Sequence, residues 1–233
     1  TLNHLFTATK YIDLIIPRGS NGLIEYVRKN SLVPVIETGA GVCHVYVQEA
    51  ADLQMAADIV VNAKTSRPSV CNAMDTVIVD RSVATAFLDI LAPRLKEKGV
   101  IAYADKTAHS ILKNKLTVYK ATAKHFATEF LSLHCAIKTV SGMEEALKHI
   151  QTYSTKHSEA IVTNDKKLAQ QFLKTVDAAA VYHNASTRFT DGEEFGLGAE
   201  VGISTQKLHA RGPFALEKLV TEKWIIEGRG QVR

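Results

Sequence analysis

Cysteine is scarce in this sequence of 233 residues, which holds only Cys43, Cys71 and Cys135. Three thiols cannot all pair, and their spacing matches no metal-ligand motif. Free thiols are typical of a reducing compartment, so we expect a cytoplasmic protein. The nine histidines form no pair at a spacing of four residues with an acidic third ligand, and no metal site is predicted.

Long apolar runs and extreme charge are also lacking. No run approaches the roughly 18 residues that cross a bilayer, and no signal peptide opens the sequence. The net charge of +4 suits an anionic small molecule such as a phosphate, and it falls short of the basic patch of a nucleic-acid-binding protein. Since hydrophobic residues make up 46%, we expect a globular protein that binds neither nucleic acid nor a membrane.

Short β-branched runs alternate with amphipathic segments along most of the chain. This alternation predicts an α/β fold with a mainly parallel sheet. An exposed strand suited to pairing with another chain is expected at 224–226. The other predicted strands are 11–17, 42–47, 76–79, 100–103, 160–163 and 178–183, with 130–140 extended, and the predicted helices are 23–29, 51–61, 83–98, 107–114, 143–152 and 165–176.

The strongest candidate for chemistry is Cys71, which lies on a short connection between a predicted helix and a predicted strand. Pro68 ends the helix, because proline cannot continue it. The nearby cations Lys64 and Arg67 are expected to lower the pKa of the thiol. A thiolate on such a loop is a candidate nucleophile for acyl transfer, although position alone fits a buried, inert thiol equally well.

Three other stretches are weaker candidates. The turn at Gly19 and Ser20 comes before a short helix and could cradle a phosphate on its backbone N–H groups. Glu37 stands beside a glycine-rich bend, where it is either a general base or, more commonly, a surface glutamate. The polar segment 184–192 follows a predicted strand; ligands gather beyond the carboxyl ends of parallel strands, so it is either a site or a solvated loop.

Longer motifs run through the chain from Tyr11 to Arg233, and they are similar to those of the γ-glutamyl phosphate reductase family of the aldehyde dehydrogenase superfamily. The motifs are Asn62-Ala-Lys-Thr65, Arg67-Pro68, Cys71-Asn72, Asn184–Gly192, Phe195–Glu200 and Gly202–Pro213. The resemblance implies an aldehyde-dehydrogenase-like catalytic domain. It also implies the NADPH-dependent reduction of γ-glutamyl phosphate to glutamate-5-semialdehyde in proline biosynthesis. Phosphate would leave as Cys71 forms a thioacyl intermediate.

The resemblance also implies roles for individual residues. Glu129 would hold the nicotinamide ribose, and Glu37 falls at the superfamily's general-base position. Charge and proximity add Arg67 as a phosphate contact, and Arg188 suits a substrate carboxylate. The predicted site comprises Cys71 and Glu37 for catalysis, Glu129, Gly19 and Ser20 for NADP(H), and Arg67, Asn72, Ser186, Thr187 and Arg188 for the substrate.

The family's chains are much longer, so the resemblance implies that an N-terminal half is absent here. Residues 1–33 would be the end of the cofactor-binding domain, 34–215 the catalytic domain and 216–233 a segment with an oligomerisation strand. A homo-oligomer and glutamate 5-kinase as pathway partner are expected. The chain alone is expected to be inactive, and a catalytically incompetent folding or assembly module stays the alternative. A cysteine hydrolase pairing Cys71 with a histidine, His44 or His183, is a weaker one.

Overall fold

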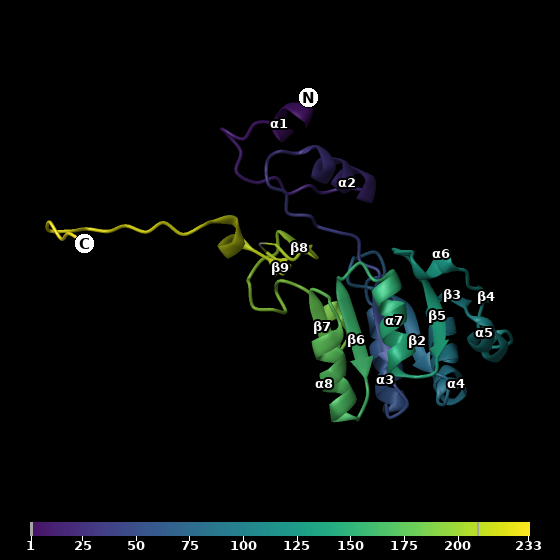
Figure 1. The fold of residues 1–233 in the computed structure, drawn as a ribbon. Coiled ribbons are helices and arrows are strands. Elements are labelled where there is room, and N and C mark those ends of the chain that lie inside the picture. The colour runs from purple at the N-terminus through teal and green to yellow at the C-terminus, as the bar shows by residue number, and fades with distance from the viewer. Residues whose placement is uncertain (1, 209) are drawn as a thin grey trace.

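The computed structural model describes residues 2–208 and 210–233, and its centre is a parallel β-sheet of seven strands (Figure 1). The strands are β1 (Cys43–Val47), β2 (Met74–Asp80), β3 (Ile101–Ala104), β4 (Val118–Lys120), β5 (His134–Val140), β6 (Ser158–Val162) and β7 (Ala180–His183). They lie in the order β4-β3-β5-β2-β1-β6-β7, and all neighbours are parallel. The predicted α/β fold with a mainly parallel sheet is therefore confirmed.

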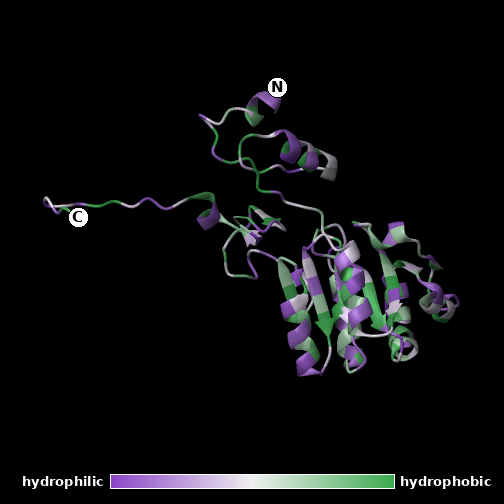
Figure 2. Ribbon diagram, in the orientation of Figure 1, coloured by the Kyte–Doolittle hydropathy of each residue, from purple (hydrophilic) through white to green (hydrophobic). Residues whose placement is uncertain are grey.

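Helices cover both faces of the sheet, because successive strand residues point to opposite sides. Val45 and Val47 pack in the core beneath the first group of helices, whereas Tyr46 packs in the core on the other face. The first group is α3 (Leu53–Thr65), α4 (Ala84–Glu97) and α5 (Lys106–Leu112), and the second is α7 (Met143–Tyr153) and α8 (Lys166–Thr175). The strands are apolar and the outer helix faces are largely hydrophilic (Figure 2).

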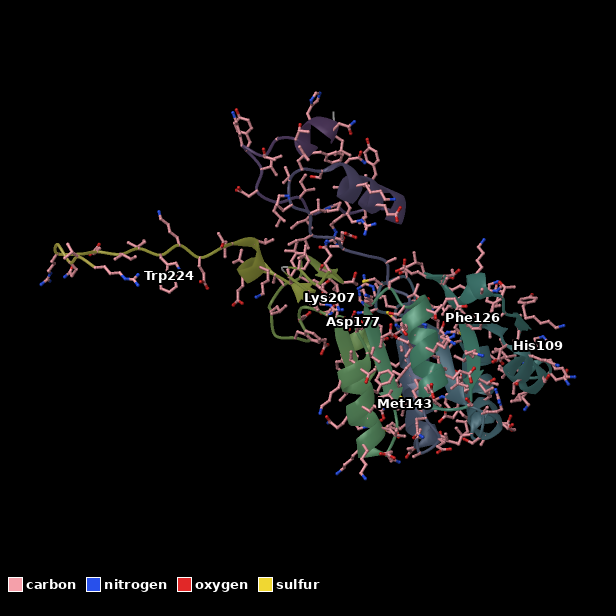
Figure 3. All side chains as sticks on the ribbon, in the orientation of Figure 1. His109, Phe126, Met143, Asp177, Lys207 and Trp224 are labelled. Atoms are coloured by element: carbon pink, nitrogen blue, oxygen red, sulfur yellow. The ribbon has the colours of Figure 1, made fainter. Side chains whose placement is uncertain are left out.

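A smaller lobe lies beyond one edge of the sheet and joins two distant parts of the chain (Figure 1). It contains α1 (Leu2–Phe6), α2 (Asn21–Asn30), and the antiparallel pair β8 (Gly202–Ser204) and β9 (Gly212–Phe214). Ile36, Ala210 and Phe214 form its small core. Asp177 on the sheet domain bonds Lys207 at 2.9 Å, which ties the two parts together (Figure 3).

The structure corrects one predicted strand, leaves the strand expected at 224–226 to pair with another chain a prediction, and adds elements that were not expected. Residues 11–17 form no strand; Ile15 alone makes an isolated bridge, to Val35, and Tyr11 is exposed. Residues 224–226 lie in an extended tail without a strand partner in the described chain. The unexpected elements are β4, β8, β9, the short helices α1 and α6 (Ala123–Phe126) and the 3₁₀ turns η1 (Thr187–Phe189) and η2 (Leu216–Leu219).

The prediction of a strand at 11–17 was wrong, because a β-branched run becomes a strand only where a neighbouring strand supplies its hydrogen bonds. The division of the chain at 33/34 and 215/216 stays a prediction. Within the described residues, no helix combines the length and the apolar character that crossing a membrane requires.

Candidate functional site

The candidate site lies at the edge of the sheet where the parallel strands begin, which faces the smaller lobe (Figure 1). Cys71 comes shortly before β2, Gly41 before β1 and Glu129 before β5. The carboxyl-end rule that made 184–192 a candidate therefore does not describe the position of Cys71. Parallel strands bring their amino ends together as closely as their carboxyl ends, so either edge can assemble a site.

The segment 184–192 nevertheless reaches this thiol. The backbone N–H of Thr163, at the carboxyl end of β6, donates to Asn184 Oδ1 at 3.0 Å. The chain then turns back, and Asn72 Nδ2 donates to the carbonyl oxygen of Thr190 at 2.9 Å. Thr187 Oγ1 donates to the carbonyl oxygen of Asn72 at 2.7 Å. These bonds clamp the segment onto the turn that carries Cys71.

Asn72 and Thr187 are buried, so the structure uses these two predicted substrate residues to hold the loop. Ser186 is buried as well, and its hydroxyl accepts from the backbone N–H of Arg188 at 3.3 Å, capping η1. A buried hydroxyl or amide that is already bonded has little capacity left for a ligand. Their contribution is to place Arg188.

Arg188 spans the loop of the nucleophile. Its Nε donates to Ser66 Oγ at 3.2 Å, and its Nη1 donates to Asn72 Oδ1. Ser66 and Asn72 flank Cys71 in the sequence, so the guanidinium is fixed beside the thiol. Arg188 is partly exposed, and its Nη2 has no acceptor in the part of the chain that the structure describes. That group is free to meet an anion.

Cys71 is partly buried, and its electrostatic surroundings differ from the prediction. Burial first of all, and then the carboxylates of Glu129 and Glu200, raise the pKa of the thiol to about 11, and Arg188 opposes them. The expectation that Lys64 and Arg67 lower this pKa is wrong. Lys64 is fully buried in an ion pair 3.4 Å from Asp75, and Arg67 points into solvent. At neutral pH the resting group is a thiol.

Glu129 and Gly41 form the other side of the site. The N–H of Gly41 donates to Glu129 Oε1 at 2.8 Å, and burial raises the pKa of this carboxyl. A Cβ atom on Gly41 would stand 1.6 Å from the carbonyl oxygen of Cys71, so only glycine fits there. The other carboxylate oxygen of Glu129 accepts no hydrogen bond within the described chain, and the carboxylate fits a pair of ribose hydroxyls beside the thiol.

The remaining predicted residues lie in the smaller lobe or near it. Glu37 Oε1 accepts from Gln206 Nε2 at 3.2 Å and lies 3.6 Å from Arg28 Nε, so its carboxylate is already engaged. Ser20 caps α2 by accepting from the N–H of Leu23, and Gly19 has a φ of 153°. In the described chain no hydrogen bond or ion pair joins these residues to Cys71.

Sequence reasoning missed three neighbours of the nucleophile. Cys43 donates through its thiol to the carbonyl oxygen of Cys71 at 3.2 Å. Gly41 packs against the same carbonyl, and Glu200 acts on the thiol through its charge. The glycine-rich bend before β1 and the acidic end of the Phe195–Glu200 motif were the available signals. Neither pointed to Cys71, because the contacts join residues far apart in sequence.

The two histidines of the hydrolase alternative serve other partners. His44 is buried, and its Nδ1 lies 2.9 Å from Glu159 Oε2. His183 Nε2 lies 2.9 Å from the carbonyl oxygen of Thr163, at the opposite edge of the sheet. Neither bonds Cys71 in the described chain, so the geometry gives no thiol–histidine pair. Across residues 2–208 and 210–233, no group of three or more His, Cys, Asp or Glu side chains could hold a metal ion.

Comparisons with known proteins agree with this geometry. No protein-family model matches the chain. The γ-glutamyl phosphate reductase of Chlorobium limicola is 56% identical over 232 residues, covering 98% of this chain and 55% of that protein. The γ-glutamyl phosphate reductase of Moorella thermoacetica is 57% identical, covering 100% of this chain and 55% of that protein.

Solved structures show the same relationship. The crystal structure of γ-glutamyl phosphate reductase from Thermotoga maritima superposes with a TM-score of 0.94 at 46% identity, covering 100% of this chain and 55% of that one. An acetylating aldehyde dehydrogenase from Geobacillus thermoglucosidasius, 21% identical, shares the fold with a TM-score of 0.61 over 87% of this chain and 51% of its own. The chain is therefore a relative of the γ-glutamyl phosphate reductases and spans about half of their length.

Proposed function

We propose that the protein carrying this chain reduces γ-glutamyl phosphate to glutamate-5-semialdehyde with NADPH, releasing phosphate, as a step of proline biosynthesis. The single observation that supports this most is the clamp of the 187–190 loop onto the Cys71–Asn72 turn. It sets a guanidinium beside a partly buried thiol. An acyl phosphate with a distal carboxylate meets both needs: a carbonyl for the sulfur and an anion for Arg188.

Cys71 performs the first step of the proposed reaction. Its sulfur attacks the acyl carbonyl, the bond from carbon to the phosphate oxygen breaks, and a thioester on Cys71 results. Because the pKa of this thiol is about 11, the group starts protonated. The departing phosphate oxygens accept that proton, so the thiol and the acyl phosphate become thioester and hydrogen phosphate. The backbone N–H of Cys71 is a candidate donor to the developing oxyanion.

The residues around the thiol suit the second substrate. NADPH, when bound, supplies the hydride that reduces the acyl group to the aldehyde. We assign Glu129 to the nicotinamide ribose, because its carboxylate is fixed by Gly41 next to Cys71. Gly19 and Ser20, at the start of α2, are proposed to face the cofactor's phosphates through backbone N–H groups.

The remaining assignments follow from charge and position. Arg67 is exposed on the loop of the nucleophile and is proposed to receive the transferred phosphate. Arg188 is proposed to bind the substrate's α-carboxylate, with Asn72, Ser186 and Thr187 holding its loop. Glu37 as general base stays a prediction; displacing phosphate needs no activated water.

We also propose a homo-oligomeric, cytoplasmic protein. Trp224 and its neighbours project from an extended tail, and such a tail can add a strand to a second copy (Figure 3). Acyl phosphates hydrolyse readily, so glutamate 5-kinase is the proposed pathway partner that supplies the substrate.

The reverse reaction provides the test. The complete protein should reduce NADP⁺ only when glutamate-5-semialdehyde and inorganic phosphate are both present, and Cys71→Ser should abolish that signal. Activity that survives in Cys71→Ser would remove the thiol from the mechanism. The alternative, an incompetent folding or assembly module, is tested on residues 1–233 alone: stoichiometric NADPH binding by this chain would contradict it.

A further inference from the structure

We propose that Glu200 recognises the α-ammonium group of the substrate, opposite Arg188, so that the site selects an α-amino acid over the corresponding plain carboxylic acid. The inference rests on the proposed function and adds a specificity residue to it.

Glu200 is fixed to the segment 184–192, which is bonded to the turn that carries Cys71. Its Oε2 accepts from the backbone N–H of Gly192 at 3.0 Å. A Cβ atom on Gly192 would stand 2.4 Å from the carbonyl oxygen of Ala199, so the two segments touch directly. Gly192 follows Thr190 by two residues, and the carbonyl of Thr190 accepts from Asn72 at 2.9 Å. Two hydrogen bonds, joined by the backbone from Gly192 to Thr190, thus connect Glu200 to the turn of Cys71.

The carboxylate of Glu200 is available to a ligand. The side chain is exposed, and its second oxygen, Oε1, accepts no hydrogen bond from residues 2–208 or 210–233. The charge of Arg18 acts to lower the pKa of this carboxyl, but Arg18 Nη1 donates to the carbonyl oxygen of Val201 instead. No ion pair between Arg18 and Glu200 is formed in the described chain. The negative charge is therefore free to pair with a cation that enters the site.

Glu200 and Arg188 act on the same sulfur with opposite signs. Glu200 raises the pKa of the Cys71 thiol, whereas Arg188 lowers it, so both charges lie within electrostatic range of the reacting atom. A γ-glutamyl group bound at this sulfur carries an ammonium and a carboxylate on one carbon, three bonds from the reacting carbonyl carbon. One guanidinium and one carboxylate match that pair of charges.

Two substrates distinguish recognition of the α-ammonium group from an effect of Glu200 on every substrate. Glutamate-5-semialdehyde carries the α-ammonium, and 5-oxopentanoate has the same chain without it. In the complete protein, Glu200→Gln should lower kcat/KM for the first about 10- to 100-fold, since bonds to charged groups are worth about 1.5–3 kcal/mol. The value for 5-oxopentanoate should change less than about twofold. Glutamine can still accept from Gly192, so the backbone bond is kept.

Two control variants neutralise a charged side chain at other positions. Glu194→Gln removes an exposed carboxylate from the same segment and should leave both substrates unaffected. Arg188→Gln should impair both substrates, because both carry the carboxylate. Equal losses for both substrates in Glu200→Gln would overturn the proposal and point to a structural or proton-accepting role.

A binding experiment tests the role of Glu200 even if the protein does not reduce NADP⁺. L-Glutamate should protect Cys71 from alkylation by iodoacetamide more strongly than glutarate does, and Glu200→Gln should erase that difference. An unmodified protein that reduces no NADP⁺ contradicts the proposed function. Equal protection by L-glutamate and glutarate in the unmodified protein contradicts the role of Glu200 alone.

Discussion

Gly41 lies directly against the carbonyl group of Cys71, although thirty residues separate them in sequence. The Cβ of any other residue would stand 1.6 Å from that oxygen, and the N–H of Gly41 already donates to Glu129 at 2.8 Å. This glycine therefore sets the distance between the thiol and the carboxylate assigned to the cofactor.

Gly41→Ala should consequently displace the turn of Cys71. We expect a loss of about 1–3 kcal/mol in the free energy of unfolding, measured by urea denaturation, together with loss of activity. Gly22→Ala is the matched control: Gly22 lies inside α2, and a Cβ there would meet only Ser20 Oγ, at 4.0 Å, so alanine should be neutral or stabilise by up to about 1 kcal/mol. Full activity in Gly41→Ala would contradict this packing.

Alkylation should report the raised pKa of Cys71. Because that pKa is about 11, the rate of reaction with iodoacetamide should rise about tenfold per pH unit from pH 7 to 10 and level off only above pH 11. Cys43 and Cys135 are fully buried and should stay unmodified in the native protein, which peptide mass spectrometry checks. A rate already constant below pH 8 would mean that the thiol is ionised at rest.

Removing one carboxylate tests the cause of that shift. Glu129 raises the pKa of Cys71, so Glu129→Gln should lower it and speed alkylation at pH 8. Glu97→Gln, an exposed carboxylate at the far end of α4, should leave the rate unchanged. An unchanged rate in Glu129→Gln would exclude Glu129 as a cause and leave burial and Glu200.

The buried pair of Lys64 and Asp75 should matter greatly for stability. Lys64→Met leaves a carboxylate 2% exposed without its cation, and this should cost about 3–5 kcal/mol in urea unfolding. The double variant Lys64→Met/Asp75→Leu should recover most of that loss, because the uncompensated charge is gone. Lys115→Met, at an exposed pair with Asp89, should cost less than about 1 kcal/mol.

Trp224 is the sole tryptophan of the chain and is 85% exposed. Its fluorescence therefore reports on the tail alone. If the tail joins a second copy, emission should shift to the blue and acrylamide quenching should weaken as protein concentration rises. Sedimentation of a dimer with unchanged emission would place the interface elsewhere.

Local patterns in the sequence predicted much of the fold. The β-branched run 76–79 became part of β2, and the helix before Pro68 ended at Thr65, because strand propensity and the geometry of proline act within a few residues. The prediction of a strand at 11–17 was wrong, because this run has the composition of a strand but no neighbouring strand to which it could bond.

The sequence by itself determined which residue is the candidate nucleophile, since Cys71 lies in a long motif on a short connection. The sign of its pKa shift was decided only by the tertiary structure. Lys64 is only seven residues from Cys71 in sequence, yet it is buried in an ion pair with Asp75. Glu129 and Glu200 are distant in sequence, and their charges act on the sulfur. Electrostatic interactions depend on separation in space and on burial, and neither is written in the spacing of residues along a chain.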